Sequence, residues 1–432
     1  MLLSLALLGL AAIVGLALVE LVIRRTDVGA GMVLGVMLLG ELALVDLTLI
    51  SSPVQVNSGD AMFIVLITAA VARFLRLERL TTPQRLMVLF GMLVAFAMYR
   101  GAGSFGVPAV INEGRKFLRF VAGVLYFSTL EPRHELLDRI GRFWLVAAAA
   151  LAGLALLRWV ANTAGLTGGL FGEGEDLRVL PATGALVIAQ GAMIALPMLM
   201  DRARGHLRYL APVLLVVLVL LQHRTVWLVT IAGLVYLMFR ERMFTARVLA
   251  ALAVGGVVFT GLVVTVFDDA EIGEDLAASS QSTGTFEWRM AGWQALLEDS
   301  GPETTAEVAV GAPFGGGWER RFDGMVIEVS PHNWYVEAYL RVGAVGIAAM
   351  LLIYAVALRG APRPARRRGG PSQPPGALTH NVLQTIVGVQ LLYYITYTPD
   401  LAQSMLLGLG CAAAAGAALG RTARTPLEVA TR

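Results

Sequence analysis

The fold class is decided by the stretch from Tyr209 to Tyr236, which reads YLAPVLLVVLVLLQHRTVWLVTIAGLVY. Apolar residues run through this stretch almost without a break, except at the polar turn Gln222–Thr225. A helix needs about 20 apolar residues to cross a hydrocarbon core about 30 Å thick. The stretch therefore predicts two membrane helices joined by a tight turn near the membrane boundary. A charge there is costly unless it is paired or hydrated, which makes Arg224 a candidate functional residue.

Similar apolar blocks recur along the whole chain of 432 residues, of which 57% are hydrophobic and 15% are charged. Soluble proteins carry about 25% charged residues, and the mean hydropathy here is +0.70. We therefore expect an all-α integral membrane protein, a polytopic bundle of about 12–13 transmembrane helices. The predicted helices lie near residues 2–23, 28–50, 56–72, 86–99, 117–130, 143–160, 182–200, 209–222, 225–239, 247–267, 338–358, 381–397 and 403–420.

Clusters of arginine between the apolar blocks predict the orientation. Basic residues mark the cytoplasmic loops of membrane proteins, so the sequence pI of about 9.2 indicates membrane orientation and not binding to nucleic acid. The chain then divides into N-terminal transmembrane helices over 1–267, one long extracytoplasmic (periplasmic) loop over 268–337, a transmembrane helix over 338–358, a cytoplasmic Arg/Pro/Gly linker over 359–380, a C-terminal transmembrane hairpin over 381–420 and a cytoplasmic tail over 421–432.

Several basic residues fall on the predicted outer side, against the usual pattern. For any one of them, anchoring at the membrane interface is a sufficient explanation. As a set they predict an anionic ligand at the outer boundary, because a guanidinium group is always charged and forks onto phosphate oxygens. The set consists of Arg100, Arg115, Lys116, Arg119, Arg158, Arg178, Arg224, Arg289, Arg320, Arg321 and Arg341.

The long outer loop carries three motifs. Phe286–Trp293 begins an amphipathic, helix-like stretch, and Gly311–Gly317 is rich in glycine, which allows tight turns and close approach of a ligand. Pro331–Glu337 stands directly before the next apolar helix. The five histidines and the single cysteine show no metal-ligand spacing, so neither a metal site nor a cofactor is expected.

The third motif offers proton-transfer chemistry. His332 as a neutral imidazole can take a proton from a sugar hydroxyl, and Glu337 can orient it or share the task. The alternative is that His332 and Asn333 are only the polar start of a helix, with Trp334 and Tyr335 in an aromatic belt at the membrane interface.

In order and spacing, these motifs resemble the core of the O-antigen ligase and O-antigen polymerase family of polytopic membrane glycosyltransferases. The resemblance covers roughly residues 215–350. In that family an Arg and a Trp open the outer-loop helix, as in Phe286–Trp293 here, and a glycine-rich turn follows. A His-Asn pair, here at His332, then precedes a helix that carries an acidic residue and a Gly-x-x-Gly. The turn at Arg224 resembles the family's Ser-Arg turn.

The resemblance implies a GT-C-like bundle in the bacterial cytoplasmic (inner) membrane, with its active site facing the periplasm. It implies a metal-independent, inverting transfer of a glycan from a polyprenyl (undecaprenyl) diphosphate carrier to an acceptor hydroxyl on a glycan or on lipid A-core. Carried over by position, Arg224 and Arg289 would bind the diphosphate, and His332 would be the base or an orienting donor. The substrate-binding residues implied in addition are Arg115, Arg119, Arg320, Asn333, Glu337 and Trp293.

Other functions stay open at this point. A ligase and a polymerase share the same donor chemistry, so the sequence does not separate them. A transporter or flippase of lipid-linked oligosaccharide would need charges inside the membrane, and Glu20, Glu41 and Asp46 lie within or near apolar blocks. A purely structural scaffold would leave the outer arginines without a reason.

Overall fold

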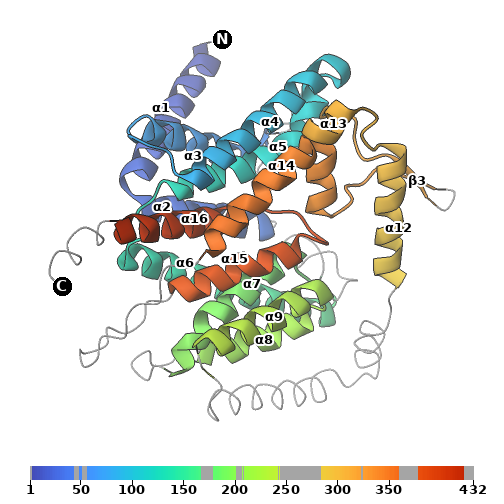
Figure 1. Ribbon diagram of the computed structural model, residues 1–432. Coiled ribbons are helices and arrows are strands. Elements are labelled where there is room, and N and C mark those ends of the chain that lie inside the picture. The colour runs from blue at the N-terminus through green and yellow to red at the C-terminus, as the bar shows by residue number, and fades with distance from the viewer. Residues whose placement is uncertain are drawn as a thin grey trace, which may run out of the picture.

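The computed structural model describes residues 2–42, 48–50, 56–166, 179–200, 207, 209–241, 243, 284–322, 325–359 and 378–422. Within these ranges the chain is largely helical, as the sequence predicts (Figure 1). The helices are α1 (Leu2–Arg24), α2 (Thr26–Glu41), α3 (Ser58–Phe74), α4 (Thr82–Phe105), α5 (Val107–Ser128), α6 (His134–Thr163), α7 (Ala182–Ala195) with the 3-10 turn η2 (Leu196–Met200), α8 (Leu210–Leu220), α9 (Arg224–Glu241), α12 (Gly284–Asp299), α13 (Thr305–Val310), α14 (Trp334–Leu358), α15 (His380–Tyr393) and α16 (Leu401–Thr422). Two antiparallel strand pairs join β1 (Thr48–Ile50) to β2 (Val56–Asn57) and β3 (Arg320–Phe322) to β4 (Met325–Ile327).

Several helices have the length and composition of membrane spans. Those long and apolar enough to cross a membrane are, among the described residues, Thr82–Phe105, His134–Asn162, Ala182–Leu199 and Trp334–Leu358. Large apolar side chains also project from the flanks of the bundle. Met92 on α4 is 62% exposed and Val146 on α6 is 67% exposed. Such exposed apolar flanks are typical of a surface that another apolar medium covers.

The helix predicted over 28–50 is wrong at its end. The helix α2 ends at Glu41, and Thr48–Ile50 form the strand β1. Both ends of that strand are β-branched residues, which favour extended backbone, and β2 supplies the hydrogen-bonding partner. Tertiary pairing thus overrides the apolar pattern at this point.

The helix predicted over 56–72 begins later, at Ser58. Asn57 ends the strand β2 and caps α3: its side-chain oxygen accepts a hydrogen bond from the Asp60 backbone N–H at 3.3 Å. The Asp60 carboxylate accepts one from the Asn57 backbone N–H at 3.1 Å. This reciprocal capping box fixes the first turn of the helix.

Among the helices that are longer than the sequence predicts are the two that contain its shortest early blocks. The blocks at 86–99 and 117–130 belong to α4 and α5, which have 24 and 22 residues. The charged residues that precede the second block continue the helix because acidic and basic partners elsewhere in the structure pair with them. Outside the described residues lie Arg178, the helix predicted over 247–267, the first part of the outer loop, and most of the linker over 359–380 and of the tail over 421–432.

The core of the bundle is built around α5 and α7. Almost every residue of α7 is buried, and so is the second half of α5. A helix that is apolar and covered on all sides is typical of the interior of a membrane bundle or a large core. The helices α5 and α16 cross where Gly123 faces Ser404, since small residues let two backbones approach closely.

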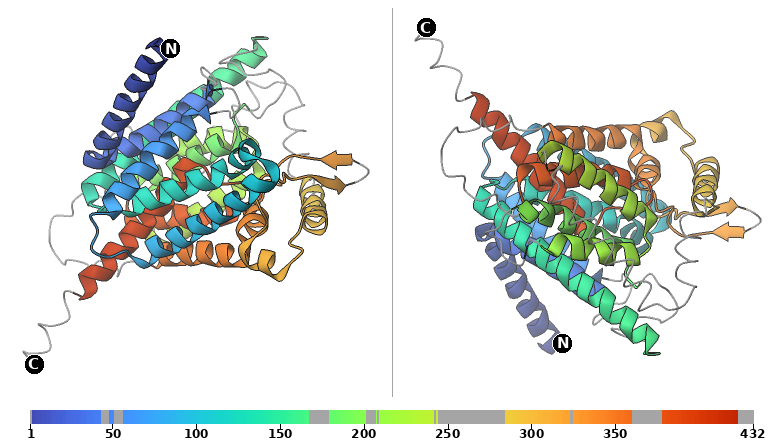
Figure 2. Two further views of the ribbon diagram at one scale, coloured as in Figure 1. Left: turned by 90° about the horizontal axis from the view of Figure 1, so that it is seen from above. Right: turned by 90° about the horizontal axis from the view of Figure 1, so that it is seen from below.

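The two ends of the bundle differ. At one end α12, α13 and the β3–β4 hairpin project beyond the bundle, whereas the last turn of α16 lies at the other (Figure 2). Arg24, Arg73 and Arg133, which belong to three of the arginine clusters between the predicted helices, line a common cavity. The structure therefore gathers these basic connections on one side of the bundle.

Two glycines in left-handed conformations bring the outer loop onto α14. Gly311 has φ 84°, and Gly343 has φ 66° and kinks α14. The kink lets the carbonyl of Leu340 accept a hydrogen bond from the Ala312 backbone N–H at 2.7 Å. A Cβ at Gly343 would collide with the carbonyl of Ala309. Only glycine allows both the φ value and this approach.

Candidate functional site

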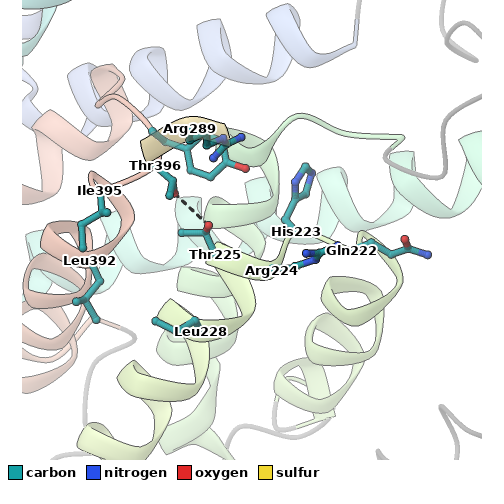
Figure 3. A pocket seen from close by; sticks show the side chains of 10 residues that line it. Gln222, His223, Arg224, Thr225, Leu228, Arg289, Leu392, Ile395 and Thr396 are labelled. Carbon is teal, nitrogen blue, oxygen red and sulfur yellow. Dashed lines mark hydrogen bonds between the residues drawn. The ribbon is translucent and has the colours of Figure 1, made fainter. Parts of the chain in front are cut away.

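Two of the predicted motifs meet the end of α15 around one cavity. Its volume is about 360 Å³, and the start of α9, the helix α12 and the turn after α15 supply its walls (Figure 3). The structure thus brings together Arg224 and Arg289, which lie on different helices. The lining residues include Arg224, Thr225, Leu228, Arg289, Thr396 and Tyr397.

The polar turn between α8 and α9 is tight. Gln222 has φ 54°, and among the described non-glycine residues only Gln222 and His332 have a positive φ. Such backbone conformations cost about 1–3 kcal/mol and cluster at functional sites. Nε2 of His223 lies 2.8 Å from the carbonyl oxygen of Leu180, and it carries the proton because a carbonyl only accepts. The turn places Arg224 at the first residue of α9, where backbone N–H groups have no partner within the helix.

Arg289 reaches the cavity from α12. Its guanidinium carbon lies 5.7 Å from the centroid of the Tyr397 ring. Within the described part of the chain, no carboxylate forms an ion pair with Arg289. On the next turn of the helix, Nε1 of Trp293 donates to the carbonyl of Pro331 at 2.7 Å. This bond fixes α12 against the segment that carries His332.

The segment before α14 holds His332 in a left-handed conformation, with φ 52°. Asn333 caps the helix, since its Oδ1 accepts from two backbone N–H groups of the first turn at 3.0 and 3.1 Å. Trp334 is fully buried against Phe117, and its backbone N–H donates to the carbonyl of Tyr394 at 3.0 Å. The alternative of a polar helix start is confirmed for Asn333. The prediction that Trp334 belongs to an aromatic belt at the membrane interface is wrong, because its ring lies in the core.

His332 is open to solvent on one side, and its surroundings favour the neutral imidazole. Partial burial and the positive charge of Arg289 lower its pKa from the usual 6.5, and Glu337 opposes this shift. Glu337 is fully buried, forms an ion pair with Lys116 and accepts a hydrogen bond from the Ser330 hydroxyl. That hydroxyl in turn accepts from the His332 backbone N–H at 3.4 Å. Glu337 therefore acts on the imidazole by its charge and holds the backbone of His332 through Ser330.

The end of α15 is the part of the site that the sequence does not reveal. A helix is predicted as far as residue 397, but α15 ends at Tyr393, and the next turn supplies Thr396 and Tyr397 to the cavity. The Thr396 hydroxyl donates to the Thr225 hydroxyl at 3.0 Å, which joins α15 to the start of α9 (Figure 3). The available signal was the run Tyr393–Asp400, in which aromatic and β-branched residues precede a proline that cannot continue a helix.

Arg115 and Arg119, predicted to bind substrate, both contact α3. A nitrogen of Arg115 lies 3.6 Å from the Asp60 carboxylate, and one of Arg119 lies 2.7 Å from it. Arg119 also donates to the side chain of Asn57 at 2.6 Å. Neither residue lines the cavity that contains Arg224. The structure shows both arginines engaged with the capping box of α3.

Arg320, the third of the predicted substrate-binding arginines, lies in β3 and is 3% exposed. Its guanidinium donates to the carbonyls of Trp318 at 3.2 Å and Val329 at 2.9 Å. Burial lowers the pKa of Arg320, and its charge contributes to the lowered pKa of His332. Arg320 thus holds the hairpin and adds positive potential near the imidazole.

Arg341 belongs to the same outer set of basic residues, but it is buried. It forms an ion pair with Glu113 and donates to the carbonyls of Pro313 at 3.1 Å and Gly317 at 2.6 Å. The Glu113 carboxylate also accepts from the Gly315 backbone N–H at 2.7 Å. This pair fastens the glycine-rich turn to α5 and α14.

The cavity combines two guanidinium groups with the start of α9. His332 is not among the residues that line it, and the charge of Arg289 links the imidazole to the cavity by lowering the pKa of His332. Among the described residues, no group of three His, Cys, Asp or Glu side chains is arranged to hold a metal ion. The chemistry of the site is inferred from its own residues, because no family model matches the chain and no curated protein matches its sequence.

Proposed function

We propose that the chain is a membrane glycosyltransferase that transfers a glycan from a polyprenyl diphosphate carrier to an acceptor hydroxyl, as an O-antigen ligase or a polysaccharide polymerase does. The observation that carries the proposal is the cavity of about 360 Å³ that Arg224 and Arg289 both line. In this proposal about 12–13 helices cross the bacterial cytoplasmic membrane, and the site faces outward.

The cavity suits a diphosphate. Arg289 has no carboxylate partner among the described residues, so its charge is available to a ligand. Arg224 stands at the first residue of α9, where the helix dipole favours an anion. Two guanidinium groups can each bond two phosphate oxygens. The tyrosine and threonine side chains of the α15 turn complete a polar wall.

An apolar face leads away from the cavity and suits a prenyl chain. It runs along α9, where Leu228, Ile231, Val235 and Phe239 are 60%, 63%, 54% and 75% exposed. Their spacing of three and four residues places them on one side of the helix. Leu228 also lines the cavity. A carrier with its diphosphate between the arginines would therefore lay its isoprenoid chain along α9.

The transfer needs a proton acceptor and a stabilised leaving group. The acceptor hydroxyl oxygen attacks the anomeric carbon of the glycan, and the bond from that carbon to the diphosphate oxygen breaks. The hydroxyl proton passes to His332, which is neutral at pH 7 because its pKa is lowered. Arg224 and Arg289 neutralise the charge that develops on the departing polyprenyl diphosphate.

Glycan transfer in proteoliposomes tests the proposal. The assay supplies a polyprenyl diphosphate oligosaccharide and an acceptor glycan, and measures released polyprenyl diphosphate together with the elongated or ligated product. We expect Arg224→Ala, Arg289→Ala and His332→Ala each to slow transfer by about 100-fold or more. The matched control is Arg79→Ala, which removes an exposed charge that lies outside the cavity.

The product separates the two transfer reactions, since a polymerase lengthens a lipid-linked glycan and a ligase joins the glycan to a different acceptor. Transfer by all three variants at the wild-type rate would show that the site assignment is wrong. If intact lipid-linked glycan crosses the bilayer and no polyprenyl diphosphate is released, the protein is a transporter and not a glycosyltransferase.

A further inference from the structure

A second cavity lies away from the candidate site, where the α1–α2 connection, the end of α3 and the start of α6 meet. Its volume is about 710 Å³. In Figure 2 the bundle separates this region from α12 and the β3–β4 hairpin. The arginines that line the cavity are Arg24, Arg25, Arg73, Arg76, Arg133 and Arg139.

The charges in this cavity do not balance. Three carboxylates face the six arginines. Asp27 is shared between Arg25 at 3.3 Å and Arg139 at 3.0 Å, and Glu131 pairs with Arg133 at 2.7 Å. Asp27 at the start of α2 and Glu131 in the α5–α6 connection are thus paired with arginines of the α1–α2 and α5–α6 connections and of α6. The end of α3 is left with positive charge.

The two arginines at the end of α3 carry that excess. Within the described ranges, neither Arg73 nor Arg76 has an ion-pair partner. Nε of Arg73 is buried and makes no hydrogen bond. Within the part of the chain that the structure describes, the guanidinium donates one long hydrogen bond, of 3.4 Å, to the carbonyl of Ile23. A buried, unsatisfied donor of a charged group is costly, so an anion that accepts from it gains binding energy.

An exposed apolar surface adjoins the cavity. Leu77 lines the cavity and is 39% exposed. Next to it on α3 and its end, Val71 and Leu75 are 50% and 83% exposed, and Leu21 on the neighbouring helix α1 is 41% exposed. A soluble anion makes no contact with this apolar surface, whereas a phospholipid places its phosphate next to its acyl chains and can contact both the arginines and the apolar surface.

We propose that this cavity is a binding site for an anionic phospholipid. The phosphate lies between Arg73 and Arg76, accepts from the buried Nε of Arg73, and leaves its acyl chains against Val71, Leu75 and Leu21. The site is separate from the transfer site and does not depend on the proposed glycosyltransferase function. It binds a lipid of the bilayer at the helix ends that carry the basic connections.

The test is equilibrium binding of a fluorescent short-chain phosphatidylglycerol to the full chain in nonionic detergent. Phosphatidylcholine and inorganic phosphate serve as competing ligands. We expect saturable binding to the wild type that Arg73→Gln/Arg76→Gln weakens by roughly 30-fold, since each basic group near a lipid surface contributes about a tenfold factor or less. Arg73→Lys/Arg76→Lys keeps the charges and should retain most of the binding, which separates loss of charge from misfolding.

The matched control is Arg79→Gln/Arg85→Gln, which removes the same charge from the α3–α4 connection and the first turn of α4, outside the cavity. Unchanged binding by this control and by Arg289→Ala supports a built lipid site that is distinct from the transfer site. Equal weakening by the control would overturn the proposal in favour of diffuse surface charge. Competition by inorganic phosphate as strong as that by phosphatidylglycerol, or equal binding of phosphatidylcholine, would also overturn it.

Discussion

Arg289 and Arg341 look alike in the sequence, since both are basic residues on the predicted outer side next to aromatic and glycine-rich motifs. In the structure they differ completely. Arg341 is 5% exposed, pairs with Glu113 and bonds two carbonyls of the glycine-rich turn. Arg289 lines a cavity and has no carboxylate partner in the described part of the chain. The position of one glutamate on α5 separates a structural arginine from one available to a ligand.

The comparison also explains why the site can be cationic in a largely apolar protein. A charge in a poorly hydrated place is costly unless it is paired. Arg341 and Arg119 meet that cost with Glu113 and Asp60. Arg289 keeps its charge beside a cavity, where a bound diphosphate would supply the missing partner. The next four predictions test this division, from the largest expected effect to the smallest.

Removing Arg341 should cause the largest loss of stability. Arg341→Met leaves Glu113 charged and buried, with side-chain exposures in the wild type of 6% for both partners. We expect the free energy of unfolding to fall by about 3–5 kcal/mol. Unfolding in detergent micelles, followed by tryptophan fluorescence, measures it. The double variant Arg341→Met/Glu113→Leu should lose clearly less, and an equal loss in both would contradict the buried-pair explanation.

Removing Arg289 should leave stability unchanged and reduce activity. Arg289→Gln is expected to slow glycan transfer by about 10²–10³-fold, because one preformed donor to the leaving group is lost. Arg289→Lys keeps a positive charge but lacks the planar set of guanidinium donors. Its transfer rate should lie between those of the wild type and Arg289→Gln. The assay is release of polyprenyl diphosphate in proteoliposomes, with thermal unfolding of each variant as the control. A large drop in the unfolding temperature of Arg289→Gln would show that Arg289, like Arg341, stabilises the fold.

The pH profile of transfer should report the link between Arg289 and His332. Burial and Arg289 lower the pKa of His332 from 6.5, so kcat/KM should fall about tenfold per pH unit only below that lowered value. In Arg289→Gln one cause of the shift is gone, and the acid limb of the residual activity should move to higher pH. The unfolded chain takes up this proton at a higher pH than the folded chain, so stability also falls as pH drops below 6.5.

Arg79→Gln is the control for that profile, because Arg79 lies outside the cavity and is not among the groups that shift the pKa of His332. Its acid limb should coincide with that of the wild type. An acid limb that stays in place in Arg289→Gln would show that another group takes the proton.

The smallest effect is expected for Arg119, a second paired arginine. Its pair with Asp60 is partly hydrated, with side-chain exposures of 23% and 17%. Arg119→Gln should lower the free energy of unfolding by about 1 kcal/mol and leave transfer within about threefold of the wild type. Unfolding and transfer are measured as for Arg289. A loss of transfer as large as that of Arg289→Gln would show that Arg119 binds substrate, as the sequence predicts.

Much of the helical fold follows from the sequence, because the length and spacing of apolar blocks depend on local composition alone. The stretch from Tyr209 to Tyr236 does form two helices around a tight polar turn. The boundaries depend on partners that the pattern does not contain. Thr48–Ile50 became a strand because β2 pairs with it, and α5 extends toward its start because its charges are paired.

For the site, residue types and motifs select Arg224, Arg289 and His332 as candidates, since a charge at a membrane boundary is costly unless it is paired or hydrated. Their arrangement came only from the tertiary structure. The fold places Arg224 and Arg289 on one cavity with Tyr397, which no motif indicated, and it places carboxylates beside Arg115, Arg119 and Arg341. The sequence determines which side chains carry charge, whereas the packing of distant helices determines which charges find a partner, because pairing requires contact within a few ångströms.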